Sequence, residues 1–284
     1  MIIDRLYKDV QDKGMVCLGL DPNIDYIPRE IKDKYQDIDE VIFQFNKKII
    51  DCTFDIVSIY KPQIAFYEAF GIKGLQAYSK TLKYIQTLGT LTLGDIKRGD
   101  ISTTASMYGK AHFTGDFEAD FITLNPFMGY DTIEPYLPYL RDGNKGIFVL
   151  LRTSNKGAKD IQYKESDGER IYYHIGDSLN QMAQEFIGTS GYSSLGLVVG
   201  GTHTDEAIDI RKRYPHLFFL IPGYNAQGAS GEDVKLYLND LNGGVVNSSR
   251  GIICAYMKEK DGYNNFEYFT RKAVLDMRED IGFK

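Results

Sequence analysis

Short runs rich in aliphatic and β-branched residues recur along the whole chain, and segments long enough for a helix separate them. We count eight such runs, each of which predicts a buried strand: Met15–Asp21, Ile56–Gln63, Leu91–Lys97, Phe121–Pro126, Gly146–Ser154, Leu195–Gly201, Leu217–Gly223 and Gly243–Gly251. Between the runs, apolar residues return at helical spacing, as they do in Ile38–Ile50. Continuous apolar strands that alternate with helices are typical of a parallel sheet whose outer face is covered. The pattern therefore predicts the α/β class and a (β/α)8 TIM barrel.

A doubly wound open sheet is the alternative fold, but the glycine-rich nucleotide motif expected after its first strand is missing. No Pro/Gly/Ser-rich linker, low-complexity segment or close repeat divides the chain, so we expect residues 1–284 to form a single barrel domain. The longest gap between strands, residues 155–194, contains the polar segment Lys164–Arg170. It predicts a loop insertion before a helix at about Gly176–Ile187.

Composition and charge exclude several classes of protein. With 43% hydrophobic and 25% charged residues the chain is globular rather than disordered. Its net charge of -6 argues against a nucleic-acid or anionic-membrane surface, which needs a basic field. The first residues have no signal-peptide core, and no apolar run approaches the roughly 18 residues of a membrane span. Cys17, Cys52 and Cys254 lack CxxC spacing, which predicts buried thiols in a reducing cytoplasm.

Metal chemistry has little support in the sequence, because the four histidines form no HxH or HxxxH pair. Polar residues instead gather at the ends of the predicted strands, as Asp21, Lys61, Asn125, Thr153 and Ser154 do. In a barrel all these ends open on one face, where barrel enzymes carry their active sites. Each residue alone has a structural explanation, such as a helix cap formed by Asp21 or Asn125. Their recurrence at nearly every strand favours a functional site.

The segment Asp95-Ile-Lys97-Arg-Gly-Asp100, at the end of the third run, sets acid, base and acid in one short stretch. Because side chains alternate faces along a strand, we expect Asp95 and Lys97 to point the same way. The second run also ends in a lysine, so Lys61 joins this set if the two strands are neighbours. The alternative is a solvated charged turn, since short motifs also arise by chance.

The loops after the seventh and eighth runs, within Pro222–Gly231 and Asn247–Ile252, predict an anion site. Such loops in barrels often bind phosphate through backbone N–H groups. Arg250 would add a guanidinium, whose geometry matches phosphate oxygens. The alternatives are that Gly223 and Gly228 serve only as turn residues and that Arg250 makes a surface salt bridge. We favour the phosphate site because Arg250 directly follows a buried run, and a phosphorylated small molecule is the expected ligand.

Taken together, these residues resemble the orotidine 5'-phosphate decarboxylases of pyrimidine synthesis. The resemblance covers most of the chain and rests on Gly19-Leu-Asp21-Pro, Lys61-Pro-Gln, Asp95–Ile101 with Thr104, Pro222-Gly with Gln227, and Arg250-Gly251. Leu124–Gly129 and Leu151–Gly157 are similar to the longer-chain, type 2 branch. The spacing from Pro-Gly to Gln is compact and the segment after Ser154 is expanded, so the residue that closes over the phosphate is left open.

The resemblance implies a cytoplasmic carboxy-lyase that needs no cofactor or metal and converts orotidine 5'-phosphate to uridine 5'-phosphate and CO2 in de novo pyrimidine biosynthesis. The family's substrate contacts fall on strand-end residues: Asp21 and Lys61 for the ribose hydroxyls, Ser154 for the pyrimidine ring, and Gln227 and Arg250 for the phosphate. It further implies a homodimer with shared sites, in which Asp100 and Thr104 complete the site of the other subunit.

Elementary chemistry agrees with these assignments. Loss of CO2 from C6 of the ring leaves a carbanion orthogonal to the π system, so without an electron-sink cofactor the protein must stabilise the charge itself. The Lys97 ammonium would do so electrostatically and then donate the proton to C6. Asp95 would disfavour the substrate carboxylate relative to CO2. Lys61 and Asp100 would keep the array ordered and Lys97 protonated.

Two other functions use similar residues. A sugar-phosphate decarboxylase or aldolase with a related motif holds an enediolate on Mg²⁺ and wants further carboxylates, whereas the second run here ends in Lys61. A non-catalytic nucleotide sensor would keep Asp21, Gln227 and Arg250 but has no need for Asp95 beside Lys97. Turnover of orotidine 5'-phosphate in the presence of EDTA separates the three.

Overall fold

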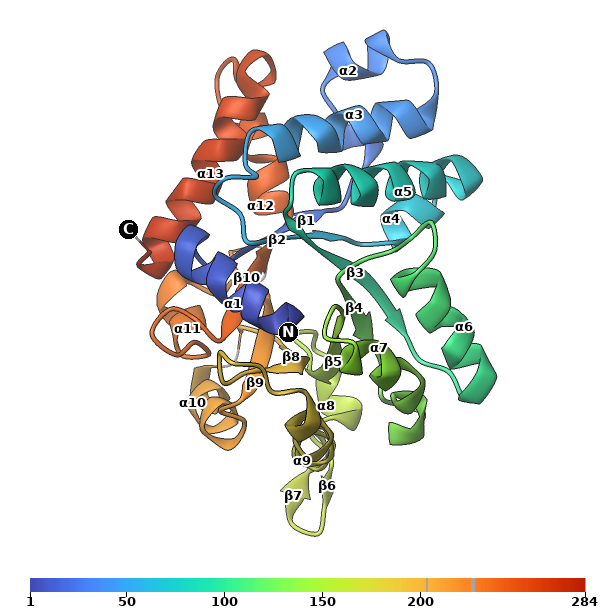
Figure 1. Cartoon of the computed structure of the whole chain (residues 1–284). Helices are drawn as coiled ribbons and strands as arrows, with labels where there is room; N and C mark the ends of the chain where they lie inside the picture. Colours follow the sequence, from blue (N-terminus) through green and yellow to red (C-terminus); the bar gives the residue numbers. More distant parts are fainter. Residues whose placement is uncertain (203, 226–227, 284) are drawn as a thin grey trace.

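The computed structural model describes residues 1–202, 204–225 and 228–283. Within them, eight parallel strands close into a barrel in the order β1-β10-β9-β8-β5-β4-β3-β2 (Figure 1). The barrel strands are β1 Val16–Leu20, β2 Ile59–Pro62, β3 Leu91–Arg98, β4 Phe121–Leu124, β5 Gly146–Arg152, β8 Ser193–Val199, β9 Leu217–Pro222 and β10 Gly244–Ser248. Nearly all their residues are buried, because helices cover one face and the barrel interior the other. The predicted barrel is confirmed.

Helices surround the barrel and connect its strands (Figure 1). The α-helices are α1 Ile2–Lys13, α2 Arg29–Lys34, α3 Ile38–Asp51, α4 Ala65–Glu68, α5 Gly71–Thr87, α6 Ser102–Phe113, α7 Leu137–Arg141, α8 Ala158–Ile161, α9 Ile171–Ala183, α10 Thr204–Arg213, α11 Gly231–Lys235, α12 Arg250–Ile253 and α13 Phe266–Ile281. Short 3₁₀ turns are η1 Ile24–Tyr26, η2 Tyr130–Thr132, η3 Glu134–Tyr136, η4 Gln184–Phe186, η5 Ala255–Lys258 and η6 Gly262–Asn265. The helix expected at Ile38–Ile50 is confirmed as α3.

Helix α1 lies across the end of the barrel opposite the strands' carboxyl ends (Figure 1). It bonds to the loops that lead into the strands: Arg5 Nη2 donates to the Gly89 carbonyl at 2.6 Å, and Asp4 Oδ1 accepts from Ser190 N at 2.8 Å. Its apolar face, which includes Leu6 and Val10, is buried. α1 thus closes this end and leaves the other for chemistry, an arrangement that the strand pattern did not predict.

The insertion between β5 and α9 contains α8 and a hairpin of β6 Glu165–Ser166 and β7 Glu169–Arg170, which projects beyond the ring of helices (Figure 1). The loop insertion is therefore confirmed, but the following helix begins at Ile171 rather than near Gly176. Gly176 lies inside this helix, where close packing requires a small residue. A Cβ on Gly176 would lie 2.2 Å from the Tyr214 hydroxyl, so this glycine marks a helix contact and not a helix start.

A half-buried carboxylate, Glu206 of α10, ties this insertion to the barrel. It accepts a hydrogen bond from the Tyr163 hydroxyl at 2.8 Å and forms ion pairs with Arg170 and with fully buried Arg152, whose Nε lies 3.4 Å away. At β5, Gln162 Oε1 accepts from Thr153 N at 2.8 Å. These contacts hold the expanded segment over the end of β5.

The three cysteines are free thiols. Cys17 lies in β1 and is buried, as predicted. Cys52 and Cys254 instead follow the last residues of α3 and α12 and are only half-buried, so the prediction of buried thiols is wrong for both. Apolar neighbours in sequence misled the prediction, because the end of a helix turns its side chains toward the rim of the core.

His112 on α6 supplies a prediction about stability. Burial, with a smaller effect from Arg98, lowers the pKa of His112 to about 4. In the unfolded chain the His112 imidazole takes up a proton near pH 6.5, but in the folded chain it does so only near pH 4. The free energy of unfolding should therefore decrease by about 3 kcal/mol, through His112, as the pH falls from 6.5 to 4. Urea unfolding at several pH values should show a smaller acid loss in His112→Leu. His216→Leu, which removes an exposed histidine, is the matched control, and an unchanged slope in His112→Leu would contradict the prediction.

Candidate active site

Three charged side chains meet at the carboxyl ends of β2 and β3. Lys61 Nζ lies 2.8 Å from Asp95 Oδ2, and Lys97 Nζ lies 2.5 Å from Asp95 Oδ1. Lys61 and Asp95 are buried, whereas 46% of the Lys97 side chain is exposed. The condition that the two strands be neighbours is met, because β2 and β3 pair directly and a further bridge joins Gln63 to Asp95. The array therefore presents one accessible ammonium on a buried ion pair.

The electrostatics keep this pair charged. Burial by itself raises the pKa of Asp95, but the ammonium groups of Lys61 and Lys97 outweigh it, and the pKa lies well below its usual value. Burial likewise lowers the pKa of Lys61, but the carboxylates of Asp95 and Asp21 reverse this and raise the pKa above its usual value. Each charge thus stabilises its neighbours, as expected for a buried pair of opposite sign.

Lys97 does not reach Asp95 through regular strand alternation. Its φ of 43° lies in the left-handed region, and the pairing of β3 with β4 shifts register between Gly94 and Arg98. For a residue with a Cβ this conformation costs roughly 1–2 kcal/mol. The two side chains therefore converge because β3 is irregular at this point, which corrects the simple alternation argument.

Asp100 and Thr104 lie away from the array within their own chain. Asp100 Oδ1 accepts a hydrogen bond from Ile101 N at 2.8 Å and makes no ion pair with the described lysines. Thr104 is exposed on the first turn of α6. Of the three charged positions in the D-x-K-x-x-D run, the fold brings together only Asp95 and Lys97.

Asp21 follows β1 and faces the array. Its charge contributes to the raised pKa of Lys61. Its Oδ1 atom is buried without a hydrogen-bond partner among the described residues. The alternative that Asp21 caps a helix is wrong, because Asn23 caps η1 by accepting from Asp25 N. Asn125 is different, since its Oδ1 accepts locally from Phe127 N at 3.0 Å. Asp21 therefore keeps a free acceptor at the mouth.

Ser154 lies two residues after the end of β5 and lines a cavity of about 510 Å³. Asn155, Lys156, Lys159 and Thr202 also line this cavity. Ser154 packs against Gly200, where an added Cβ would lie 2.8 Å from the Ser154 Cβ. The expanded insertion therefore forms a wall of the space beside Ser154.

Arg250 begins α12, two residues after the end of β10, and its exposed guanidinium makes no hydrogen bond or ion pair with any residue that the structure describes. Among residues 1–202, 204–225 and 228–283, the surface salt bridge considered as an alternative is therefore not formed. Gly223 and Gly228 both have positive φ values, 117° and 95°, so they do turn the chain in ways that favour glycine. Gln227, the other predicted phosphate contact, lies outside the described residues.

Thr123, on β4, is a site residue that the sequence reasoning missed. Its hydroxyl donates to Asp95 Oδ1 at 2.9 Å from the neighbouring strand. The available signal was a polar residue inside the apolar run Phe121–Leu124.

No group of three or more His, Cys, Asp or Glu side chains suited to a metal ion occurs in the described ranges. Over the same residues, no helix is both long and apolar enough to cross a membrane.

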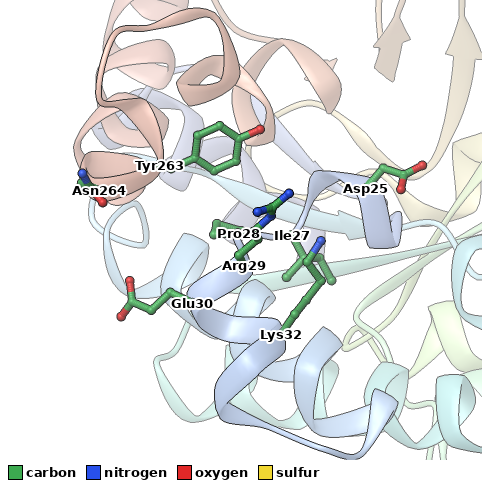
Figure 2. Close-up of a pocket in the computed structure, with 8 residues that line it drawn as sticks. All are labelled: Asp25, Ile27, Pro28, Arg29, Glu30, Lys32, Tyr263 and Asn264. Atoms are coloured by element: carbon green, nitrogen blue, oxygen red, sulfur yellow. The ribbon is translucent and has the colours of Figure 1, made fainter.

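A larger cavity of about 570 Å³ lies elsewhere, between η6 and the segment that follows β1. Figure 2 shows its lining residues: Asp25, Ile27, Pro28, Arg29, Glu30, Lys32, Tyr263 and Asn264. None of the described candidate site residues lines it. Cavity size therefore does not mark the site, and the charged array does.

Comparison with known proteins decides the family. The model of the orotidine 5'-phosphate decarboxylase / HUMPS family matches residues 14–262. The chain belongs to this family. Among curated decarboxylases of this name, that of Petrotoga mobilis is 62% identical over 283 residues, covering 99% of this chain and 98% of the relative. The Clostridium acetobutylicum decarboxylase is 56% identical over 282 residues, covering 99% of both chains.

Solved structures agree with this decarboxylase family. The putative orotidine-monophosphate decarboxylase of Toxoplasma gondii aligns with a TM-score of 0.81 and 31% identity, covering 98% of this chain and 97% of that one. A putative orotidine 5'-phosphate decarboxylase from Streptomyces avermitilis aligns with a TM-score of 0.80 and 26% identity, covering 98% and 95%. The barrel predicted from the strand pattern is thus the fold of its relatives.

Proposed function

We propose that the chain is a carboxy-lyase that converts orotidine 5'-phosphate to uridine 5'-phosphate and CO2, a step of pyrimidine biosynthesis. Family membership and full-length relatives named for this decarboxylase support it. The observation that carries the proposal is the array in which Lys61 and Lys97 hold Asp95 between them at the barrel mouth. Active sites of such barrels lie at this end of the strands.

In the proposed mechanism, Lys97 is the proton donor to C6. Its ammonium is the accessible member of the array and would stabilise the carbanion before protonating it. Asp95, held ionised, would lie against the substrate carboxylate and disfavour it relative to neutral CO2. Lys61 would keep Asp95 ordered and share the ribose hydroxyls with Asp21, whose Oδ1 lacks a partner within the described chain.

The remaining substrate contacts extend across the mouth. We assign the pyrimidine ring to Ser154, beside its cavity, and the phosphate to Gln227 and Arg250, after β9 and β10. The unpaired guanidinium of Arg250 supports the phosphate contact, because a free arginine offers paired donors to phosphate oxygens. The reaction is proposed to need neither cofactor nor metal.

We propose a homodimer with shared active sites, in which Asp100 and Thr104 contact the substrate of the other subunit. Both lie outside their own array. Large apolar side chains are exposed around them: Ile101 at 51%, Met107 at 64%, Phe127 at 74% and Met128 at 51%. Ile101 and Met107 lie at the start of α6 and within it, and Phe127 and Met128 follow β4. The bond from Asn125 N to the Arg98 carbonyl, at 2.7 Å, joins the ends of β3 and β4 that lead into these segments. Exposed apolar groups of this size favour a protein interface.

Three finer assignments complete the proposal. We place the enzyme in the cytoplasm, where its three free thiols would persist. We treat residues 1–284 as one domain, since one core cluster runs from Ile2 to Ile281. We assign the chain to the longer-chain, type 2 branch, which its expanded segment after Ser154 supports. No nucleic-acid or membrane partner is proposed.

The activity is tested with orotidine 5'-phosphate and EDTA, by following the loss of substrate ultraviolet absorbance. Undiminished turnover supports the proposed decarboxylase. Turnover that EDTA removes and Mg²⁺ restores would favour a metal-dependent sugar-phosphate enzyme, and binding of uridine 5'-phosphate without turnover of orotidine 5'-phosphate would favour a sensor. The buried Lys61–Asp95 pair speaks against the metal-dependent enzyme, because a lysine occupies the position where a further carboxylate ligand is wanted.

Arg250→Ala tests the phosphate contact. We expect kcat/KM for orotidine 5'-phosphate to fall by about 100-fold, since losing charge-assisted hydrogen bonds removes roughly 3 kcal/mol. Turnover of orotidine, which lacks the phosphate, should stay within about threefold, because binding energy from a remote group lowers the barrier only when that group is present. Arg29→Ala, at the separate cavity, is the control and should leave both substrates unaffected. Equal losses on both substrates would make Arg250 structural.

A further inference from the structure

A single hydroxyl connects Asp95 to the backbone of Lys97. Thr123 Oγ1 donates to Asp95 Oδ1 at 2.9 Å and accepts from Ile96 N at 3.0 Å and from Lys97 N at 2.9 Å. A hydroxyl has one proton to donate and two lone pairs, so these three bonds use its full capacity. Thr123 is 1% exposed. Its hydrogen bonds are therefore all internal to the site.

The strand pairing explains why the backbone needs this partner. β3 and β4 pair at Gly94↔Ile122 and again at Arg98↔Leu124, so three residues of β3 lie opposite the single residue Thr123. Extra residues in one strand lose their ladder partners and re-aim side chains, as in a β-bulge. The Ile96 and Lys97 N–H groups bond to the Thr123 hydroxyl at this break. The side chain of Thr123 thereby stabilises the left-handed conformation of Lys97.

Lys97 is consequently held at both ends. Its backbone N bonds to Thr123, while its Nζ lies 2.5 Å from the same Asp95 oxygen to which Thr123 donates. Movement of the Thr123 hydroxyl would shift the backbone of Lys97, and it would also shift the Asp95 carboxylate that orients the Lys97 ammonium. In the proposed function, the ribose and the phosphate of the substrate are bound by Asp21, Lys61 and Arg250, which belong to other strand ends. The geometry therefore links Thr123 to the placement of the ammonium rather than to substrate affinity.

We infer that Thr123 is a positioning residue for decarboxylation: its hydroxyl sets the geometry of Lys97 and Asp95 without touching the substrate. This inference rests on the proposed function and adds to it a residue from a third strand. A misplacement of about 1 Å in a reacting group is enough to cost about 100-fold in rate. Thr123 must therefore affect kcat more than KM.

The test is a set of substitutions that separates the hydroxyl from packing. Thr123→Val keeps the branched shape and removes the hydroxyl, and we expect kcat to fall about 10- to 100-fold. KM and calorimetric affinity for uridine 5'-phosphate should stay within about threefold. Thr123→Ser keeps the hydroxyl and loses the methyl group, so kcat should remain near wild type. A residue that only packs would give the reverse order, with serine worse than valine.

Thr92→Val is the matched control, since Thr92 is also a buried barrel threonine bonded to an aspartate, Asp120, at 2.8 Å. It should lower the melting temperature without lowering kcat. If Thr123→Val does not fold, kcat of Thr123→Ala is compared with that of Thr123→Ser instead. Equal kcat values for these two variants would overturn the inference. Wild-type kcat in folded Thr123→Val would overturn it too. Failure of the wild type to decarboxylate would instead overturn the proposed function.

Discussion

Lys97→Ala is expected to abolish decarboxylation and leave nucleotide binding largely intact. The variant loses both the electrostatic stabilisation of the carbanion and the proton donor to C6, so kcat should fall by about 10⁴-fold or more. The proposed phosphate and ribose contacts come from Asp21, Lys61 and Arg250, on other strand ends. Calorimetric titration with uridine 5'-phosphate should therefore give an affinity close to that of the wild type.

Lys83→Ala is the matched control for this experiment. Lys83 is an exposed lysine that pairs with Asp116 on the helical surface, and its loss should leave kcat unchanged. Circular dichroism should confirm that Lys97→Ala folds, because Lys61 still compensates the buried charge of Asp95. If Lys97→Ala retained more than about one tenth of the wild-type rate, Lys97 would not be the proton donor.

The second large effect concerns the shared site. If Asp100 acts across a two-fold axis, each site takes Lys97 from one chain and Asp100 from the other. Lys97→Ala and Asp100→Ala homodimers should each be nearly inactive. A heterodimer of the two variants carries both lesions in one site and leaves the other site intact. Random exchange makes half the dimers mixed, so mixing should restore about one quarter of the wild-type activity.

Native mass spectrometry of the mixture supplies the control, because it shows whether subunits have exchanged. Exchange accompanied by recovered activity supports the action of Asp100 in the partner's site. Exchange with activity still at the parental level would mean that Asp100 acts within its own chain. The structure makes this a sharp choice, since the carboxylate of Asp100 bonds to Ile101 N and not to either lysine of its own array.

The strand pattern predicted the barrel well because burial is a local signal. Helices enclose every strand, so each becomes a continuous apolar run that is visible in sequence. The same signal predicted strands that are longer than those in the structure. Ile56 and Val57 are buried, yet β2 begins only at Ile59, because burial by itself does not make a residue part of the ladder. The helix after the insertion begins five residues earlier than expected, at Ile171, and Gly176 lies inside it, where a side chain would clash with Tyr214, 38 positions away in sequence.

The sequence by itself determined the fold class and placed Lys61, Asp95 and Lys97 in one expected set, because apolar runs and the polar residues at their ends are local signals. Only the tertiary structure decided that Asp100 stands apart, that Arg250 has no partner in the described chain, and that Thr123 completes the array. The role of Thr123 depends on the register between two strands, because β3 has three residues where β4 has one. No local pattern records such a mismatch, since it exists only once the two strands are paired.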